Sequence, residues 1–127
     1  IFSEDYISYF SKQEIIIAEL DKTQLIRIMT NLVNNATHAL DEVENKKIEV
    51  SVDEDNSNVI IIVADNGKGI SNEDKEHVFE PKFTTKSSGM GLGLPMVKNI
   101  VETYDGTITF TTQLNKGTVF KIVLPKK

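Results

Sequence analysis

Residues 59–70 read VIIIVADNGKGI, a β-branched apolar run that ends in a carboxylate and two glycines. The run predicts a strand buried on both faces, which would hold Asp65 rigidly at its tip. A fixed carboxylate only accepts hydrogen bonds, so it suits a donor such as an exocyclic amine. Gly67 and Gly69 have no Cβ, so a flat ligand could lie directly on their backbone. An ordinary turn has the same composition, and this stretch alone does not separate the two interpretations.

The composition is typical of one globular domain. The 127 residues include 14 basic and 19 acidic side chains, which give a net charge of -5, and no cysteine. The acidic balance argues against nucleic acid or an anionic membrane as a partner, and the missing thiols exclude disulfides and thiolate metal sites. The longest apolar runs are too short to cross a bilayer. Because the chain begins at Ile1, not at methionine, we expect a longer parent protein.

The N-terminal segment has an ambiguous pattern. Aromatic residues fall at helical spacing within residues 1–13, which indicates either a remnant of an upstream helix or linker, or a frayed terminus. Residues 14–19 form a short β-branched run that predicts a strand. We therefore place one domain at residues 14–127 and treat residues 1–13 separately.

The clearest predicted helix begins at Asp21, which makes an Asp-x-x-Gln capping box with Gln24. Apolar residues then recur at three- and four-residue spacing, which predicts one buried face. These residues are Leu25, Ile28, Met29, Leu32, Val33, Ala36 and Leu40.

The opposite side of this helix carries three asparagines and a histidine. Asn31, Asn35 and His38 are spaced so that they point the same way, and Asn34 lies beside them. Asparagine is a mediocre helix former, so three within one turn are a poor choice for stability alone. We favour a binding role for this face over a merely solvated one.

The rest of the chain alternates short strands with helices and turns. Alternation of apolar and polar residues predicts strands at 48–52, 107–112 and 118–124, and a turn at 53–58 leads into the strand from 59. A short helix capped by Ser71 and Asp74 is expected to run to about Phe79, followed by a loop at 80–88. A second main helix is expected from about 94, with Gly106 at its end. This order predicts an α+β fold with a mixed, mostly antiparallel sheet and two main helices on one face.

Glycines precede the second main helix. Gly89, Gly91 and Gly93 would gather unpaired N–H groups and the positive end of the helix dipole, which attract phosphate. The spacing is not Gly-x-Gly-x-x-Gly, and no Gly-Lys-Ser/Thr follows. The motif alone is equally typical of a flexible loop before a helix.

Four short motifs in order carry a family resemblance. They are NLVNNA at 31–36, DNGKG at 65–69, FEPKF at 79–83 and GMGLGL at 89–94, followed by GTVFKIVLP at 117–125. They resemble the N, G1, F and G2 boxes of the GHKL superfamily, which includes DNA gyrase, large heat-shock chaperones, mismatch-repair ATPases and sensor histidine kinases. The resemblance implies the two-layer α/β sandwich of the Bergerat type. The F box and the compact G2 box resemble a bacterial sensor histidine kinase. The order Phe83-Thr-Thr85-Lys86, followed by a short run to the glycines, resembles the nitrogen-sensor type of kinase, which has a short lid.

The resemblance also implies roles in binding ATP and Mg²⁺. Asp65 would accept the adenine amino group with help from Thr118, Asn35 would bind Mg²⁺, and Asn31 and His38 would face the phosphates or the metal's waters. Lys86, in a lid at 79–88, would contact the γ-phosphate. Further ATP contacts are expected from Gly67, Gly69, Ile70, Phe79, Thr85, Gly89, Gly91, Leu92, Gly93 and Leu94.

A kinase is favoured over an ATPase. The superfamily's ATPases carry a glutamate base four residues before the metal asparagine, where this chain has Asn31. Asn31, Asn35 and Lys86 would therefore serve phosphoryl transfer. The acceptor would be a histidine on a separate dimerisation domain of the same protein, which then serves a response regulator.

We expect this domain to be cytoplasmic and to make no direct contact with a membrane. The parent protein could be anchored in the inner membrane by another segment. The alternatives are a serine/threonine kinase of the anti-sigma type on the same fold, and a degenerate domain that binds a nucleotide or a partner without chemistry.

Overall fold

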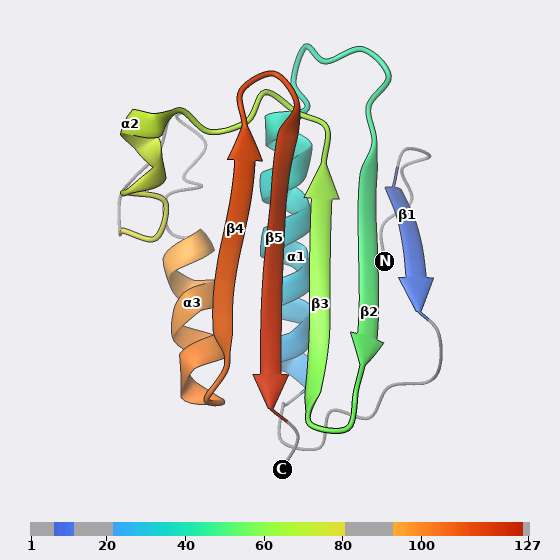
Figure 1. Cartoon of the computed structure of the whole chain (residues 1–127), viewed down its shortest axis with the longest axis vertical. Coiled ribbons are helices and arrows are strands. Elements are labelled where there is room, and N and C mark those ends of the chain that lie inside the picture. The colour runs from blue at the N-terminus through green and yellow to red at the C-terminus, as the bar shows by residue number, and fades with distance from the viewer. Residues whose placement is uncertain (1–6, 12–21, 81–92, 126–127) are drawn as a thin grey trace.

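The computed structural model describes residues 7–11, 22–80 and 93–125, which form one sheet and three helices (Figure 1). In chain order the elements are β1 (Ile7–Ser11), α1 (Lys22–Ala39), β2 (Ile48–Glu54), β3 (Asn58–Asp65), α2 (Asn72–Lys75), α3 (Gly93–Thr103), β4 (Thr107–Gln113) and β5 (Gly117–Pro125).

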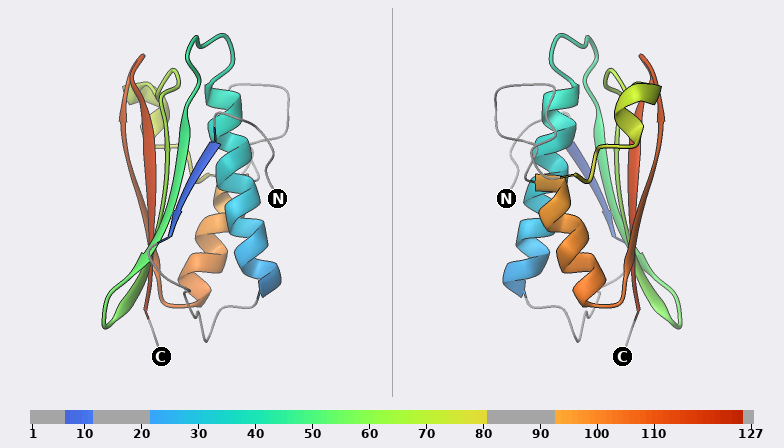
Figure 2. Two further views of the ribbon diagram at one scale, coloured as in Figure 1. Left: turned by 90° about the vertical axis from the view of Figure 1, so that its right-hand side faces the viewer. Right: turned by 90° about the vertical axis from the view of Figure 1, so that its left-hand side faces the viewer.

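The sheet is mixed and has five strands in the order β1-β2-β3-β5-β4. β1 runs parallel to β2, whereas the other neighbouring pairs are antiparallel. The helices α1 and α3 lie side by side on one face of this sheet (Figure 2). The predicted α+β class, the mixed sheet and the two helices on one face are confirmed.

The core lies between the sheet and these two helices. Five of the seven residues predicted for the buried face of α1 are at most 2% exposed, and Leu25 and Met29 pack at its edge. From α3, Leu94, Val97, Ile100 and Val101 are buried against them. The 3.6-residue period of both helices therefore identified the faces that meet in the core.

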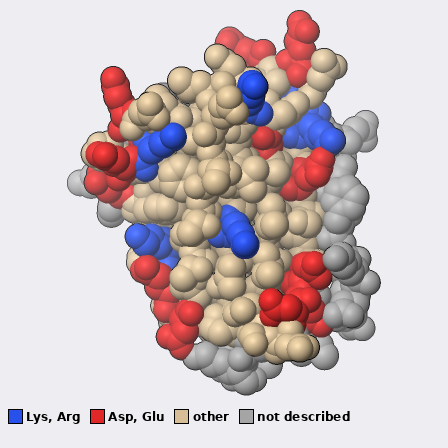
Figure 3. Space-filling view, in the orientation of Figure 1, with Lys and Arg blue, Asp and Glu red and all other residues tan. Residues whose placement is uncertain are grey.

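The prediction that the central strand is buried on both faces is wrong. Val59, Ile61 and Val63 of β3 are at most 1% exposed and face the helices, whereas Ile60 and Ile62 on the other face are partly exposed. No helix among the described residues covers that other face. Figure 3 views it and shows mostly uncharged atoms, with acidic side chains toward the edges.

The helical interpretation of the N-terminal segment is wrong for Ile7–Ser11. These residues form β1, which extends the sheet from Ile7 opposite Ile48 to Ser11 opposite Val52. Spacing within the segment could not reveal a parallel partner some forty residues away. The strand predicted at 14–19 and the cap at Asp21 lie outside the described residues, and the domain division after residue 13 stays a prediction.

Of two helix ends predicted from the sequence, the start of α2 is confirmed and the end of α3 differs in detail. Ser71 caps α2 as predicted, since its hydroxyl accepts the N–H of Asp74 at 3.2 Å. The helix is shorter than predicted, because it ends at Lys75 and turns follow to Phe79. At the end of α3, Asp105 and not Gly106 takes the left-handed conformation, with φ of 62°. The N–H of Gly106 donates to the Val101 carbonyl at 2.9 Å, which closes the helix.

Gly106 is needed for a different reason, which is its close approach to β5. A Cβ at this position would lie 2.6 Å from the Val123 carbonyl oxygen and 2.8 Å from a methyl group of Leu124. Since one of these atoms belongs to the backbone of β5, the contact cannot be relieved by a side-chain rotation alone.

We expect Gly106→Ala to destabilise the domain by about 1–3 kcal/mol, because it overpacks the contact between the α3–β4 turn and β5. The control is Glu102→Ala, an exposed helical position where the change should stay within about 0.5 kcal/mol. Urea unfolding of both variants measures the difference. Equal midpoints for Gly106→Ala and the wild type would contradict this account of the turn.

Candidate functional site

Asp65 ends β3 at the edge of the core, and its carboxylate is held by backbone donors. Its Oδ1 accepts the N–H of Gly67 at 2.8 Å. Burial raises the pKa of Asp65 to about 6, while hydrogen bonds from the backbone of Gly67 and Thr118 oppose part of that rise. The group is therefore a carboxylate at neutral pH that has lost much of its hydration without gaining a cationic partner among the residues that the structure describes. It remains able to accept a hydrogen bond from a ligand.

Three polar side chains form a row across β3, β5 and β4 at this end of the sheet. Asp65 lies opposite Thr118, and Thr118 lies opposite Thr112. Because paired residues of antiparallel strands share a face, the three side chains lie on the helix-covered face. Thr118 is 3% exposed and is the one buried polar residue in the described part of the chain, and its Oγ1 is 2.8 Å from that of Thr112. The role predicted for Thr118 beside Asp65 is consistent with this position, whereas Thr112 was not predicted.

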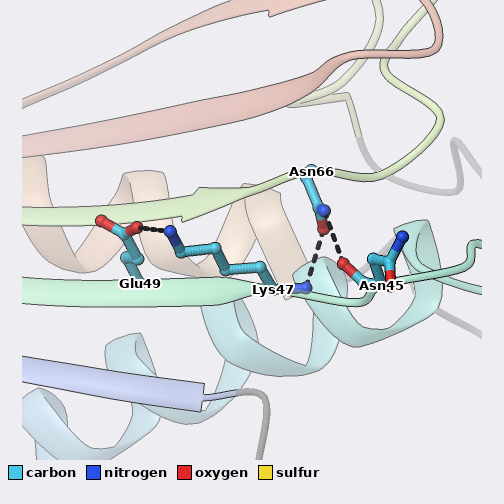
Figure 4. Close-up of polar contacts among 4 residues, drawn as sticks. All are labelled: Asn45, Lys47, Glu49 and Asn66. Carbon is cyan, nitrogen blue, oxygen red and sulfur yellow. Dashed lines mark hydrogen bonds and ion pairs between the residues drawn. The ribbon is translucent and has the colours of Figure 1, made fainter.

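Asn66 clamps the tip of β3 to the segment before β2 (Figure 4). Its Oδ1 accepts the N–H of Lys47 at 2.8 Å, and its Nδ2 donates to the Asn45 carbonyl at 2.8 Å. The side-chain amide thus takes the place of a peptide group and extends the pairing of β2 with β3 past Asp65. The ion pair of Lys47 with Glu49, also drawn there, is exposed and contributes little. The sequence offered only the turn propensity of Asn66 as a signal.

The glycines after Asp65 meet protein and not open space. A Cβ at Gly67 would lie 2.4 Å from the Ala39 carbonyl oxygen at the end of α1, and one at Gly69 would lie 2.4 Å from that of Gln113. Gly69 also has φ of 76°. The interpretation that both glycines are there to leave a flat surface for a ligand therefore needs correction, because neighbouring backbone occupies those positions. Their contact with a nucleotide stays a prediction.

The polar side of α1 meets the first residue of α3. Asn31 Nδ2 donates to the Arg27 carbonyl at 2.7 Å, and a methyl group added at Gly93 would lie 2.8 Å from Asn31 Oδ1. Asn35 and His38 are partly exposed on the same helix. The structure therefore brings α1 close to Gly93 at the start of α3, while the roles of these side chains toward Mg²⁺ and phosphate stay predictions.

Two predicted nucleotide contacts belong mainly to the packing of the domain. The Phe79 ring packs edge-on against Phe110 and Phe120, at 5.9 and 6.5 Å between centroids, and Lys98 Nζ lies 5.3 Å from its centre. Leu94 is 7% exposed in the core. Phe79 and Leu94 come before and after residues 81–92 in the sequence. Those residues lie outside the described part of the chain and include Thr85, Lys86, Gly89, Gly91 and Leu92.

The sequence has many relatives among sensor kinases. Residues 20–127 match the family model described as histidine kinase-, DNA gyrase B- and HSP90-like ATPase. The sensor histidine kinase ZraS of Escherichia coli is 40% identical over 107 residues, which are 84% of this chain and 23% of that protein. Sporulation kinase A of Bacillus subtilis is 36% identical over 84% of this chain and 17% of that protein. The chain thus spans about a fifth of these relatives.

The fold has solved counterparts as well. The catalytic domain of the histidine kinase ThkA, in a nucleotide-free form, superposes with a TM-score of 0.79 at 34% identity, over 94% of this chain and 78% of that domain. None of the described helices here has the length and apolar character needed to span a membrane. The chain belongs to the family of histidine kinase-, DNA gyrase B- and HSP90-like ATPases.

Proposed function

We propose that this chain is the ATP-binding catalytic domain of a sensor histidine kinase. The observation that carries the proposal is the Asp65 carboxylate at the tip of β3. It is held by backbone donors, has no cationic partner among the described residues, and lies in a domain whose relatives are sensor kinases. The identity of these relatives also supports this function over a serine/threonine kinase of the anti-sigma type.

In this proposal Asp65 binds the adenine amino group. One carboxylate oxygen is engaged by Gly67, so the carboxylate is oriented while it can still accept from a ligand. Its position in the row with Thr118 places two oxygen-bearing side chains together at the edge of the core. An amine donor fits such a site because an amine supplies hydrogens to acceptors that are partly shielded from water.

Mg²⁺ and the phosphates would lie along the polar face of α1. Asn35 offers a neutral hard oxygen for Mg²⁺, which would neutralise charge on the phosphates when bound. Asn31 and His38 share this face, and Gly93 begins the helix that approaches it. From the resemblance we assign Thr85, Lys86, Gly89, Gly91 and Leu92 to the phosphates and the lid.

The phosphoryl acceptor would be a histidine on a separate dimerisation domain, which then serves a response regulator. Asn31 cannot take a proton, and its amide is already engaged with the Arg27 carbonyl, so activation of water is disfavoured. The domain would supply positioning and electrostatic stabilisation. Because ATP and response regulators are cytoplasmic, we also place the domain there.

We expect Asp65→Asn to lose adenine nucleotide affinity while the domain stays folded. The Gly67 N–H should donate to the oxygen of the new asparagine side chain, so the NH₂ group of that side chain turns toward the adenine amine. A lost charged hydrogen bond and an opposed donor cost about 2–4 kcal/mol, or about 30- to 1,000-fold in Kd. Calorimetry with ATP and Mg²⁺ measures this, with Glu102→Gln as the control for loss of one negative charge. Wild-type affinity in folded Asp65→Asn would refute the role of Asp65.

We also expect this chain to bind ATP without phosphorylating itself. Neither His38 nor His77 is followed by the acidic residue that the resemblance implies for an acceptor, because Ala39 and Val78 come next in the sequence. The test is incubation with labelled ATP and Mg²⁺, with and without the histidine-bearing helical hairpin of the longer protein added in trans. Label on the hairpin only, labile to acid and stable to base, is the expected result. Stoichiometric label on this chain alone would overturn the assignment of the acceptor to another domain.

A further inference from the structure

Thr112 on β4 lies outside every motif in the sequence, yet it joins three segments of the site. Its Oγ1 accepts the N–H of Ile70 at 2.9 Å, donates to the Gly117 carbonyl at 3.2 Å and lies 2.8 Å from Thr118 Oγ1. The segment after Asp65, the strand β5 and the strand β4 therefore meet at one hydroxyl group. A threonine needed only for its strand propensity would not require these partners.

The partners determine which way the hydrogen bonds run. A hydroxyl has one hydrogen and two lone pairs. The Gly117 carbonyl can only accept, so it takes the Thr112 hydrogen, and the Ile70 N–H can only donate, so it takes one lone pair. The lone pair that remains accepts the hydroxyl hydrogen of Thr118. This is the one arrangement that satisfies all three contacts.

The direction of this chain has a consequence for Thr118. Because its hydrogen is committed to Thr112, the Thr118 oxygen keeps only lone pairs for other partners. Thr118 stands directly between Asp65 and Thr112 in the row across the sheet, and it is 3% exposed. The Asp65 carboxylate is also an acceptor at neutral pH. The two side chains at this end of the row thus offer acceptors without a competing donor.

We propose that Thr112 is a positioning residue that sets base selectivity. By accepting the hydroxyl hydrogen of Thr118, it keeps Thr118 an acceptor, so that Asp65 and Thr118 together favour a 6-aminopurine over a 6-oxopurine. This inference rests on the proposed binding of adenine beside Asp65. A 6-oxo group presents an acceptor where the amino group presents a donor, so it meets two acceptors in the wild type. Without the Thr112 hydroxyl, the Thr118 hydroxyl is free to rotate and donate to that oxygen.

The test compares the binding of ATP and ITP, with Mg²⁺, to the wild-type chain and to Thr112→Val. Valine keeps the shape of threonine but removes its hydroxyl. We expect ATP binding to weaken about three- to tenfold, the range of one neutral hydrogen bond, and the preference for ATP over ITP to shrink by at least that factor. Thr112→Ser, which restores the hydroxyl, should recover the wild-type preference.

Thr111→Val is the matched control, since Thr111 is the exposed neighbour on the same strand, and it should leave both affinities unchanged. If folded Thr112→Val keeps the wild-type ratio of ATP affinity to ITP affinity, the proposal is overturned and Thr112 has only a structural role. This holds even if both affinities fall by the same factor. Should Thr112→Val fail to fold, a wild-type ratio that persists in Thr112→Ala would overturn it equally. If the wild type binds neither nucleotide, the proposed function itself fails.

Discussion

The partly buried carboxylate of Asp65 is the constraint on which this end of the sheet depends. Burial raises its pKa from 3.8 to about 6, so the folded state binds protons more tightly than the unfolded chain. This group therefore lowers the stability of the empty domain as pH rises from about 4 to about 6. A group that opposes folding at neutral pH is typical of a site that a ligand completes.

The surrounding backbone supplies what the carboxylate lacks. Gly67 donates to Asp65 and also packs against the end of α1, where the Lys68 N–H donates to the Ala39 carbonyl at 3.0 Å. Asn66 fixes the same turn to the segment before β2. The Asp-Asn-Gly sequence thus serves electrostatics and close packing at once. Any change there should affect both the orientation of the carboxylate and the docking of α1 on the sheet.

The sequence predicted those features that depend on local periodicity or on a run of neighbouring residues. The apolar period identified the buried face of α1, and the order of four boxes identified the family and its fold. Features that depend on strand register were missed. The place of Thr112 in the site follows from its position opposite Thr118 on β5. The strand β1 was missed because its partner, β2, is distant in the sequence. The exposed face of β3 was missed because an apolar run does not reveal how many layers cover it.

The most direct test of the central claim is the pKa of the Asp65 carboxyl, measured by carbon-detected NMR titration with and without adenine nucleotide. The structure predicts a value of about 6 in the empty domain. Nucleotide should lower it, because an amine that donates to the carboxylate favours the charged form. A value near 4 in the empty domain, or one that nucleotide leaves unchanged or raises, would contradict the account.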